Sequence, residues 1–156
     1  MNTQIEESDE SEKERVDREL TELLDEIRIA IPGAEVLFAF LLGVAFTERL
    51  GEATSLQRNV YFATLLCTAA ATALLIAPSA YHRIRFREGD KAQLLFTATR
   101  MMIGSLVLLL IAVSGAVFLV GDVLYSSRVA AIAGAASAAW FVAFWFGLPL
   151  LRRARD

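Results

Sequence analysis

The chain has 156 residues, 56% of them hydrophobic, and a formal net charge of −3. Soluble domains usually contain about 45–50% apolar residues. The excess here lies in four long apolar blocks separated by short charged segments, which excludes an ordinary soluble globular domain. The net charge conceals an asymmetry, because acidic residues crowd residues 1–27 while the remainder is net positive. The overall charge therefore gives no reason to expect a nucleic-acid partner.

The N-terminal segment divides into two parts. Residues 1–11 lack an apolar stripe and are expected to form a disordered acidic tail. Residues 12–30 are predicted to form an amphipathic cytoplasmic helix, because apolar residues recur there at spacings of three and four. Its polar face is acidic, which favours packing on protein over lying on anionic lipid. The expected partners are the basic central loop or the same helix of a neighbouring subunit. The stripe consists of Val16, Leu20, Leu23, Leu24, Ile27 and Ile31.

Four apolar blocks follow, at about residues 31–50, 60–78, 101–123 and 129–151. A helix needs roughly 20 apolar residues to cross about 30 Å of hydrocarbon. Inside a bilayer the backbone must satisfy its own hydrogen bonds, so each block is predicted to be a helix. The predicted fold class is all-α, an integral membrane four-helix bundle over 31–151 followed by a short basic tail over 152–156. Aromatic residues at span ends are expected to lie in the membrane interface. They are Tyr61, Tyr81, Trp140, Phe141, Phe144, Trp145 and Phe146.

Prolines mark the predicted helix boundaries. Pro32-Gly33 stands at the start of the first span, and proline fits the first turn of a helix, where its missing N–H costs nothing. Pro32 is therefore expected to begin the membrane helix and to separate it from the cytoplasmic one. Pro78 and Pro149, each followed by basic residues, are interpreted as stops of the second and fourth spans.

The distribution of Lys and Arg predicts the orientation. Twelve of the 15 basic residues fall in the N-terminal segment, the central loop and the C-terminal tail, which share one side of a four-span protein. Basic residues are retained on the cytoplasmic side. Both termini are thus expected in the cytoplasm.

Glu35 is the ionisable residue predicted to lie inside a span, and such a residue is by default a functional candidate. Two interpretations remain open. One is structural: Glu35 would complement the positive end of the helix macrodipole or pair with a basic residue of the central loop. The other places Glu35 on an ion or proton pathway.

Further pathway candidates are hydroxyl and carboxyl groups. Thr64, Thr68 and Thr72 share one face of the second span, although such hydroxyls more often bond to the preceding turn or to a neighbouring helix. Asp122 lies at the outer end of the third span. Together with Glu48 and Glu52 it either lines an outer mouth that attracts cations or is simply solvated.

A basic cluster is expected at the cytoplasmic surface, as an anchor of the topology and a possible contact of lipid head groups. It consists of His82, Arg83, Arg85, Arg87 and Lys91. Cys67 and a single histidine form no metal-ligand set, so no metal and no cofactor are expected. Nucleotide-binding and nucleophile motifs are lacking too, and no enzyme activity is expected.

Repeated small residues indicate close helix packing, either within one chain or between copies. They are Ala69, Ala73 and Ala77, then Ala131, Ala135 and Ala139, and also Gly43, Thr47 and Gly51.

Three stretches carry a family resemblance. They are LLDEIRIAIPGAEVLFAFLL at residues 23–42, VYFATLLC at 60–67 and APSAYHR at 77–83. The chain resembles, over about residues 20–123, a family of short bacterial, largely actinobacterial, membrane proteins known only as a domain of unknown function. The resemblance implies a bacterial inner-membrane location and transfers no catalytic or binding residues.

Two functions follow as hypotheses. The first is a homo-oligomeric channel or transport-type protein that moves ions, because a bundle of four helices rarely encloses an aqueous path alone. The alternative is a membrane-anchored interaction or regulatory module that recruits a cytoplasmic protein partner through the acidic N-terminal helix.

Overall fold

The secondary structure is helical throughout the described chain. The computed structural model describes residues 2–84, 91–148 and 151. Within them lie α1 (Asn2–Val44), α2 (Glu48–Gly51), α3 (Ser55–Ile84), α4 (Lys91–Leu124), α5 (Ser127–Phe141) and a π-helical segment, η1 (Val142–Gly147). No strand occurs among these residues, so the all-α prediction is confirmed.

Four helical segments are long and apolar enough to cross a bilayer. They are Glu14–Val44, Ser55–Tyr81, Ala92–Leu124 and Ser127–Gly147, and the shortest has 21 residues. About 20 residues suffice for the hydrocarbon core. The predicted number and order of the spans are therefore confirmed, although the first ends at Val44 and not near residue 50.

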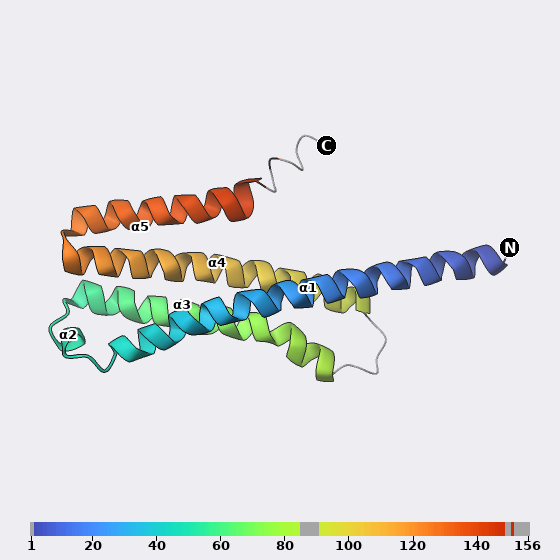
Figure 1. Cartoon of the computed structure of the whole chain (residues 1–156), viewed down its shortest axis with the longest axis horizontal. Helices are drawn as coiled ribbons and strands as arrows, with labels where there is room; N and C mark the ends of the chain where they lie inside the picture. The colour runs from blue at the N-terminus through green and yellow to red at the C-terminus, as the bar shows by residue number, and fades with distance from the viewer. Residues whose placement is uncertain (1, 85–90, 149–150, 152–156) are drawn as a thin grey trace.

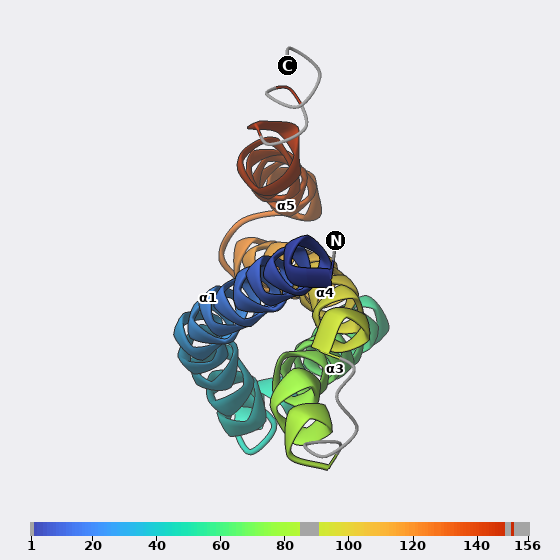
Figure 2. The same ribbon diagram turned by 90° about the vertical axis from the view of Figure 1, so that its right-hand side faces the viewer.

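The helices run along one long axis, with α4 at the centre (Figure 1). α4 packs against α1, α3 and α5, whereas α5 packs mainly on α4 and lies on the outside of the bundle (Figure 2). We call the end where α1 projects and where α3 precedes α4 the proximal end. The other end, which carries α2 and the turn between α4 and α5, is the distal end.

Buried side chains repeat every seven residues along α1. Leu20, Ile27, Ala34 and Leu41 are all buried. A seven-residue repeat keeps one face of a helix against its neighbours and is typical of left-handed bundles. Ile27 and Ala34 share a cluster with Ala71 and Leu75 of α3 and Leu109 of α4. The amphipathic stripe predicted over residues 12–30 is thus the first part of the face that α1 packs on the bundle.

The same spacing governs α3 and α4. Positions three and four apart are buried along α3, and these are Tyr61, Thr64, Thr68, Ala71, Leu75 and Pro78. Small residues let the helices approach. A Cβ atom on Gly115 of α4 would overlap Oγ1 of Thr64, and one on Gly121 would lie 3.0 Å from Cα of Ala130 in α5. Close approach of small residues is the main source of helix packing in lipid.

The structure differs from the sequence interpretation in the N-terminal part. α1 begins at Asn2 and continues through Pro32 to Val44, so it includes residues 2–11 and has no break at Pro32. Proline removes one backbone bond, but the side chain of Pro32 is exposed and leaves the packed face intact. Because Ile27 and Ala34 are buried on either side of Pro32, packing holds the helix continuous. Proline is tolerated in this way inside membrane helices.

Pro78 also fails to end its helix, contrary to the prediction. α3 continues to Ile84, and Pro78 lies fully buried on the packed face. Here the ring fills space against neighbouring helices, which offsets part of the cost of the lost hydrogen bond. Pro149 lies outside the described residues.

The aromatic residues near the C-terminus divide between two environments. The helix widens to the π form over η1, where ring pairs Trp140–Phe144 and Phe141–Trp145 have centroids 4.6 Å and 4.8 Å apart. Trp145 packs against the buried cluster of α1, α3 and α4, whereas Trp140 is exposed. Part of the predicted interfacial belt therefore serves in helix packing.

The contact between α4 and α5 gives a first prediction. A Cβ on Gly134 would lie 3.3 Å from both Cβ of Phe118 and the carbonyl oxygen of Ser114. Gly134→Leu should push α5 from α4 and lower the free energy of unfolding by about 2 kcal/mol. SDS titration from mixed micelles, followed by tryptophan fluorescence, measures this change. Ala131→Leu on the exposed side of α5 is the matched control; equal losses in both variants would contradict the packing of α5 on α4.

Candidate functional site

Glu35 lies deep within the first span and its side chain is exposed. It follows Arg28 by seven residues, roughly 10 Å along a helix, and precedes Val44 by nine, roughly 14 Å. Glu35 thus lies inside the first span, between the charged Arg28 and the end of the helix at Val44. Among the described residues, no ion pair or hydrogen bond involves its carboxylate. An ionisable group at this depth is costly, on the order of 3 kcal/mol for an aspartate or a basic residue.

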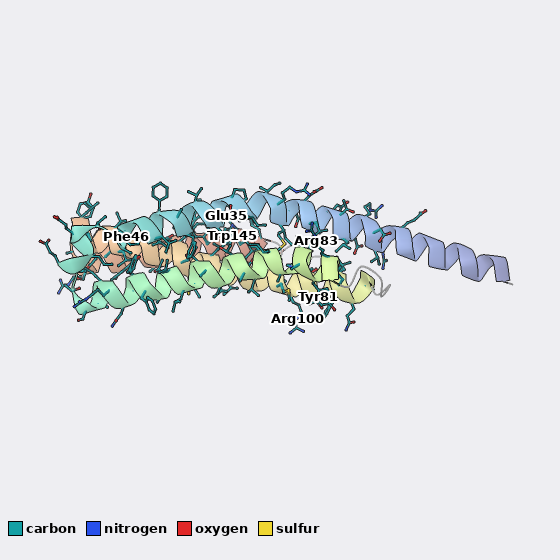
Figure 3. The ribbon with its side chains drawn as sticks, turned by 90° about the horizontal axis from the view of Figure 1, so that it is seen from below. Glu35, Phe46, Tyr81, Arg83, Arg100 and Trp145 are labelled. Carbon is teal, nitrogen blue, oxygen red and sulfur yellow. The ribbon has the colours of Figure 1, made fainter. Side chains whose placement is uncertain are left out.

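The macrodipole interpretation of Glu35 is wrong. It required a helix that starts near Pro32, but α1 starts at Asn2, 33 residues before Glu35. The favourable field of a helix N-terminus fades within the first turn. The other structural interpretation pairs Glu35 with a basic residue of the central loop, of which Arg85 and Arg87 lie outside the described residues. Arg83, at the end of α3, lies well away from Glu35 (Figure 3).

Two small residues extend the face of α1 that carries Glu35. Ala39 and Gly43 follow it at four-residue intervals, so all three lie along one side of the helix. Both are exposed, and a Cβ on Gly43 would meet nothing within 4 Å. We call Glu35, Ala39 and Gly43 the Glu35 face.

The threonines predicted beside a pathway are packed inside the bundle. Thr64 and Thr68 are 2% and 0% exposed, and Thr64 lies against Gly115. The hydroxyl of Thr68 donates to the carbonyl of Thr64 at 2.8 Å, and that of Thr72 to the carbonyl of Thr68 at 2.9 Å. These are bonds to the preceding turn of α3. The structure does not bring the threonines together with Glu35.

Asp122 belongs to a polar contact at the distal end. Nε2 of Gln57 donates to Oδ2 of Asp122 at 2.8 Å and so joins α3 to α4. Gln57 is held by Thr54, since each backbone N–H bonds to the other's side chain, at 2.9 Å and 3.2 Å. This reciprocal pair is a capping box at the start of α3. Glu48 and Glu52 are exposed nearby in sequence. Asp122 thus links α3 to α4.

The predicted basic cluster is only partly described. α3 extends as far as Ile84, and its Arg83 is exposed. α4 begins at Lys91. Arg85 and Arg87 lie outside the described residues, as does the side chain of His82. Within the described chain, no group of three His, Cys, Asp or Glu residues could hold a metal ion.

Tyr61 has a role that differs from the predicted interfacial anchor. It is 7% exposed, and its hydroxyl donates to the carbonyl of Leu41 in α1 at 2.6 Å. After Leu41 the helix tightens, because the N–H of Ala45 bonds to the carbonyl of Leu42. The last carbonyls of a helix lack intrahelical partners. Tyr61, from α3, supplies the missing donor to the carbonyl of Leu41. The three- and four-residue spacing of Tyr61, Thr64 and Thr68 is the sequence signal that could have placed Tyr61 on the packed face of α3.

An open groove lies between α1 and α4 at the proximal end. Its α1 wall carries the carboxylates of Glu19, Glu22 and Glu26, and its α4 wall includes Phe96 and Arg100. Two exposed ion pairs lie along α1. Nε of Arg15 is 3.7 Å from Oε1 of Glu19, and Nε of Arg18 is 4.0 Å from Oε1 of Glu22. Exposed pairs of this kind contribute little to stability. We call the three glutamates the acidic wall.

Four long apolar helices, a core of small residues and a carboxylate deep in a span define a multi-pass membrane protein. Contact of its helices with a lipid bilayer follows from their composition. The chain belongs to a family of unknown function, DUF6328, which it matches over residues 9–149. That range includes all four spans and most of the proximal part of α1. Comparison with curated proteins and with solved structures finds no match.

The bond between Tyr61 and Leu41 gives a second prediction. Tyr61→Phe should lower the free energy of unfolding by about 1 kcal/mol, because a buried carbonyl loses its donor. The SDS titration described for Gly134→Leu measures it. Tyr125→Phe, at a side chain 74% exposed, should change nothing. A Tyr61→Phe protein as stable as the wild type would show that this bond does not hold α1 to α3.

Proposed function

We propose that the protein is a homo-oligomeric channel or transport-type protein that moves ions across the bacterial inner membrane. The observation that supports this function is Glu35, an exposed carboxyl group within a span that has no partner among the described residues. Carboxyl groups at such depths typically belong to ion or proton pathways. Both termini are proposed to be cytoplasmic, because twelve of the 15 basic residues fall in the three segments that share one side of the membrane, and basic residues are retained on the cytoplasmic side.

The proposed path runs beside Glu35 at a contact between copies of the chain. A path through the middle of one bundle is disfavoured, because Thr64 and Thr68 are buried between helices and the hydroxyl of Thr68 already donates to the carbonyl of Thr64. Glu35 is outside that packed region. A second copy could shelter the carboxyl group from lipid and provide the opposite wall of a path.

Flux through proteoliposomes tests this function. We expect the wild type to carry Na⁺, K⁺ or H⁺ above the background of empty liposomes. Glu35→Gln keeps the size of the side chain but cannot ionise, and it should reduce the flux about tenfold or more, as expected for loss of an interaction of about 1.4 kcal/mol. Fluorescent indicators of each ion inside the vesicles report the rate.

Glu14→Gln is the matched control, because Glu14 lies on the same helix but is exposed in its charged proximal part. Its flux should equal that of the wild type. Wild-type flux at the empty-liposome background for all three ions would contradict the proposed function, and so would full flux in Glu35→Gln.

A second candidate, a membrane-anchored interaction or regulatory module, is favoured by a different observation. α1 projects past the proximal ends of α3 and α4 (Figure 1). Its acidic wall borders an open groove. A cytoplasmic protein with a basic surface would complement this charge.

Combined substitution of Glu19, Glu22 and Glu26 by glutamine tests the second candidate. The three substitutions neutralise the acidic wall and leave the buried Leu20 and Ile27 unchanged, so the bundle should remain folded. Proteins that co-purify with the wild type would be identified, purified and titrated against both forms. A partner whose affinity falls at least about tenfold in the triple variant, and falls with salt, would support the module. Unchanged affinity would contradict it.

A further inference from the structure

The α4 wall of the proximal groove lies on the same side of α4 as α5. Where the two helices pack, Phe118 and Gly121 of α4 face α5. Arg100 and Ile103, which line the groove, precede these two residues by 18 positions, or about five full turns of an α-helix. α5 stops short of this part of α4, which extends past it at the proximal end (Figure 1). The groove therefore begins where α5 ends.

The register of the two helices brings the end of α5 and η1 to the groove. Gly121 lies against Ala130, and the helices run in opposite directions. Leu148 follows Ala130 by 18 residues and Ile103 precedes Gly121 by 18, so Leu148 is about level with Ile103 in the groove wall. The chain thus leaves the bundle beside the groove.

A contact with α1 agrees with this placement. Trp145, near the end of η1, packs against the buried cluster that includes Ile27 of α1. Leu23 of α1 packs on the same cluster and lines the groove. The C-terminal end of η1 is therefore close to the α1 wall as well as to the α4 wall.

The sequence after η1 complements the groove in polarity. Leu148 and Leu151 are 49% and 63% exposed, and the groove offers apolar side chains such as Leu95 and Ile103. Residues 152–156, which lie outside the described residues, carry three positive charges and one negative charge; we call them the basic tail. Its cations are Arg152, Arg153 and Arg155.

The acidic wall has carboxylates available for these cations. Glu26 forms no ion pair among the described residues. The other two glutamates have only the exposed pairs with Arg15 and Arg18, which exchange partners at little cost. The cation of the groove itself, Arg100, stacks on the α4 wall, where its guanidinium carbon lies 5.5 Å from the ring centroid of Phe96. The α1 wall therefore stays negative.

We propose that the basic tail of the same chain occupies the proximal groove, with the guanidinium groups of its arginines against the acidic wall. Arg152 and Arg155 follow Leu148 by four and seven residues, the same spacings that lead from Ile103 back to Thr99 and Phe96. The tail is thus long enough to reach the wall. Planar guanidinium groups suit carboxylates, with which they form paired hydrogen bonds. This contact would join the end of the fourth span to α1.

The chain's own tail is favoured over other occupants because the register holds it beside the groove. A tethered segment has a far higher effective concentration than the tail of a second copy. Anionic lipid head groups also attract arginines, but three carboxylates on α1 would repel those head groups from the groove. The proposal goes beyond both candidate functions, because neither ion flux nor a cytoplasmic partner is needed for it.

Disulfide formation between the groove and the tail tests the contact. Cys67 is the sole cysteine, so Cys67→Ser gives a background in which Thr99→Cys is placed in the groove and Ala154→Cys in the tail. In vesicles of neutral phosphatidylcholine, mild oxidation should link the two within one chain. Both thiols would then be lost to a maleimide-polyethylene glycol reagent, with no dimer in SDS gels. Ala80→Cys, exposed on α3, replaces Thr99→Cys in the matched control and should react about ten times more slowly.

Charge reversal separates binding from mere proximity. Glu22→Arg with Glu26→Arg, or Arg152→Glu with Arg153→Glu, should each slow the linkage about tenfold, because like charges then face one another. All four substitutions together should restore the rate. The free energy of unfolding of each variant, measured by the SDS titration used for Gly134→Leu, shows that the bundle remains folded.

Four results would overturn the proposal. One is an equal rate with Ala80→Cys, and another is a rate that charge reversal leaves unchanged. A disulfide-linked dimer in place of the bond within one chain would assign the groove to the tail of a second copy. A linkage that anionic lipid abolishes and charge reversal of the wall does not affect would assign the arginines to the membrane surface. None of these results depends on the flux assay or on a cytoplasmic partner.

Discussion

The structure depends on the close contact that small side chains allow between α3 and α4. Lipid offers little hydrophobic advantage for bringing helices together, so van der Waals contact at short range must hold a membrane bundle. Gly115 admits Thr64, and Ala71, Ala98 and Ala112 are fully buried. α1 then packs on both α3 and α4, and α5 packs mainly on α4.

In α1 the seven-residue repeat of buried residues runs through both a charged and an apolar part of the helix. Leu20 and Ile27 lie in a segment rich in charged residues, whereas Ala34 and Leu41 lie in an apolar one, yet all four belong to one packed face. The face continues through Pro32 because the proline is turned away from it. The charged proximal segment and Glu35 are consequently parts of one continuous helix.

The sequence was sufficient for the features that depend on composition over long windows. Twenty apolar residues have few alternatives in a bilayer, so the number, order and helical form of the spans followed directly. Local signals were less reliable. Pro32 and Pro78 have strong intrinsic preferences for helix boundaries, but the packing of the residues around them outweighs those preferences. The sequence near each proline does not show this packing, because it involves residues of other helices. The macrodipole argument for Glu35 failed for the same reason, because it depended on where the helix starts.

The polar side chains illustrate the same limit in another way. Tyr61, Thr64 and Thr68 occur at the spacing of a packed face, and that spacing was visible in the sequence, but a hydroxyl on such a face fits a pathway as well as a hydrogen bond to the backbone. Which of these two roles a hydroxyl has depends on the residues of the neighbouring helix that face it. In the structure the residue opposite Thr64 is Gly115, whose lack of a side chain leaves room for the Thr64 hydroxyl. Among the described residues, Glu35 has no hydrogen-bond or ion-pair partner. The hydroxyls at the centre of the bundle are thus bonded and packed, whereas the carboxyl group of Glu35 is exposed at the surface of the bundle.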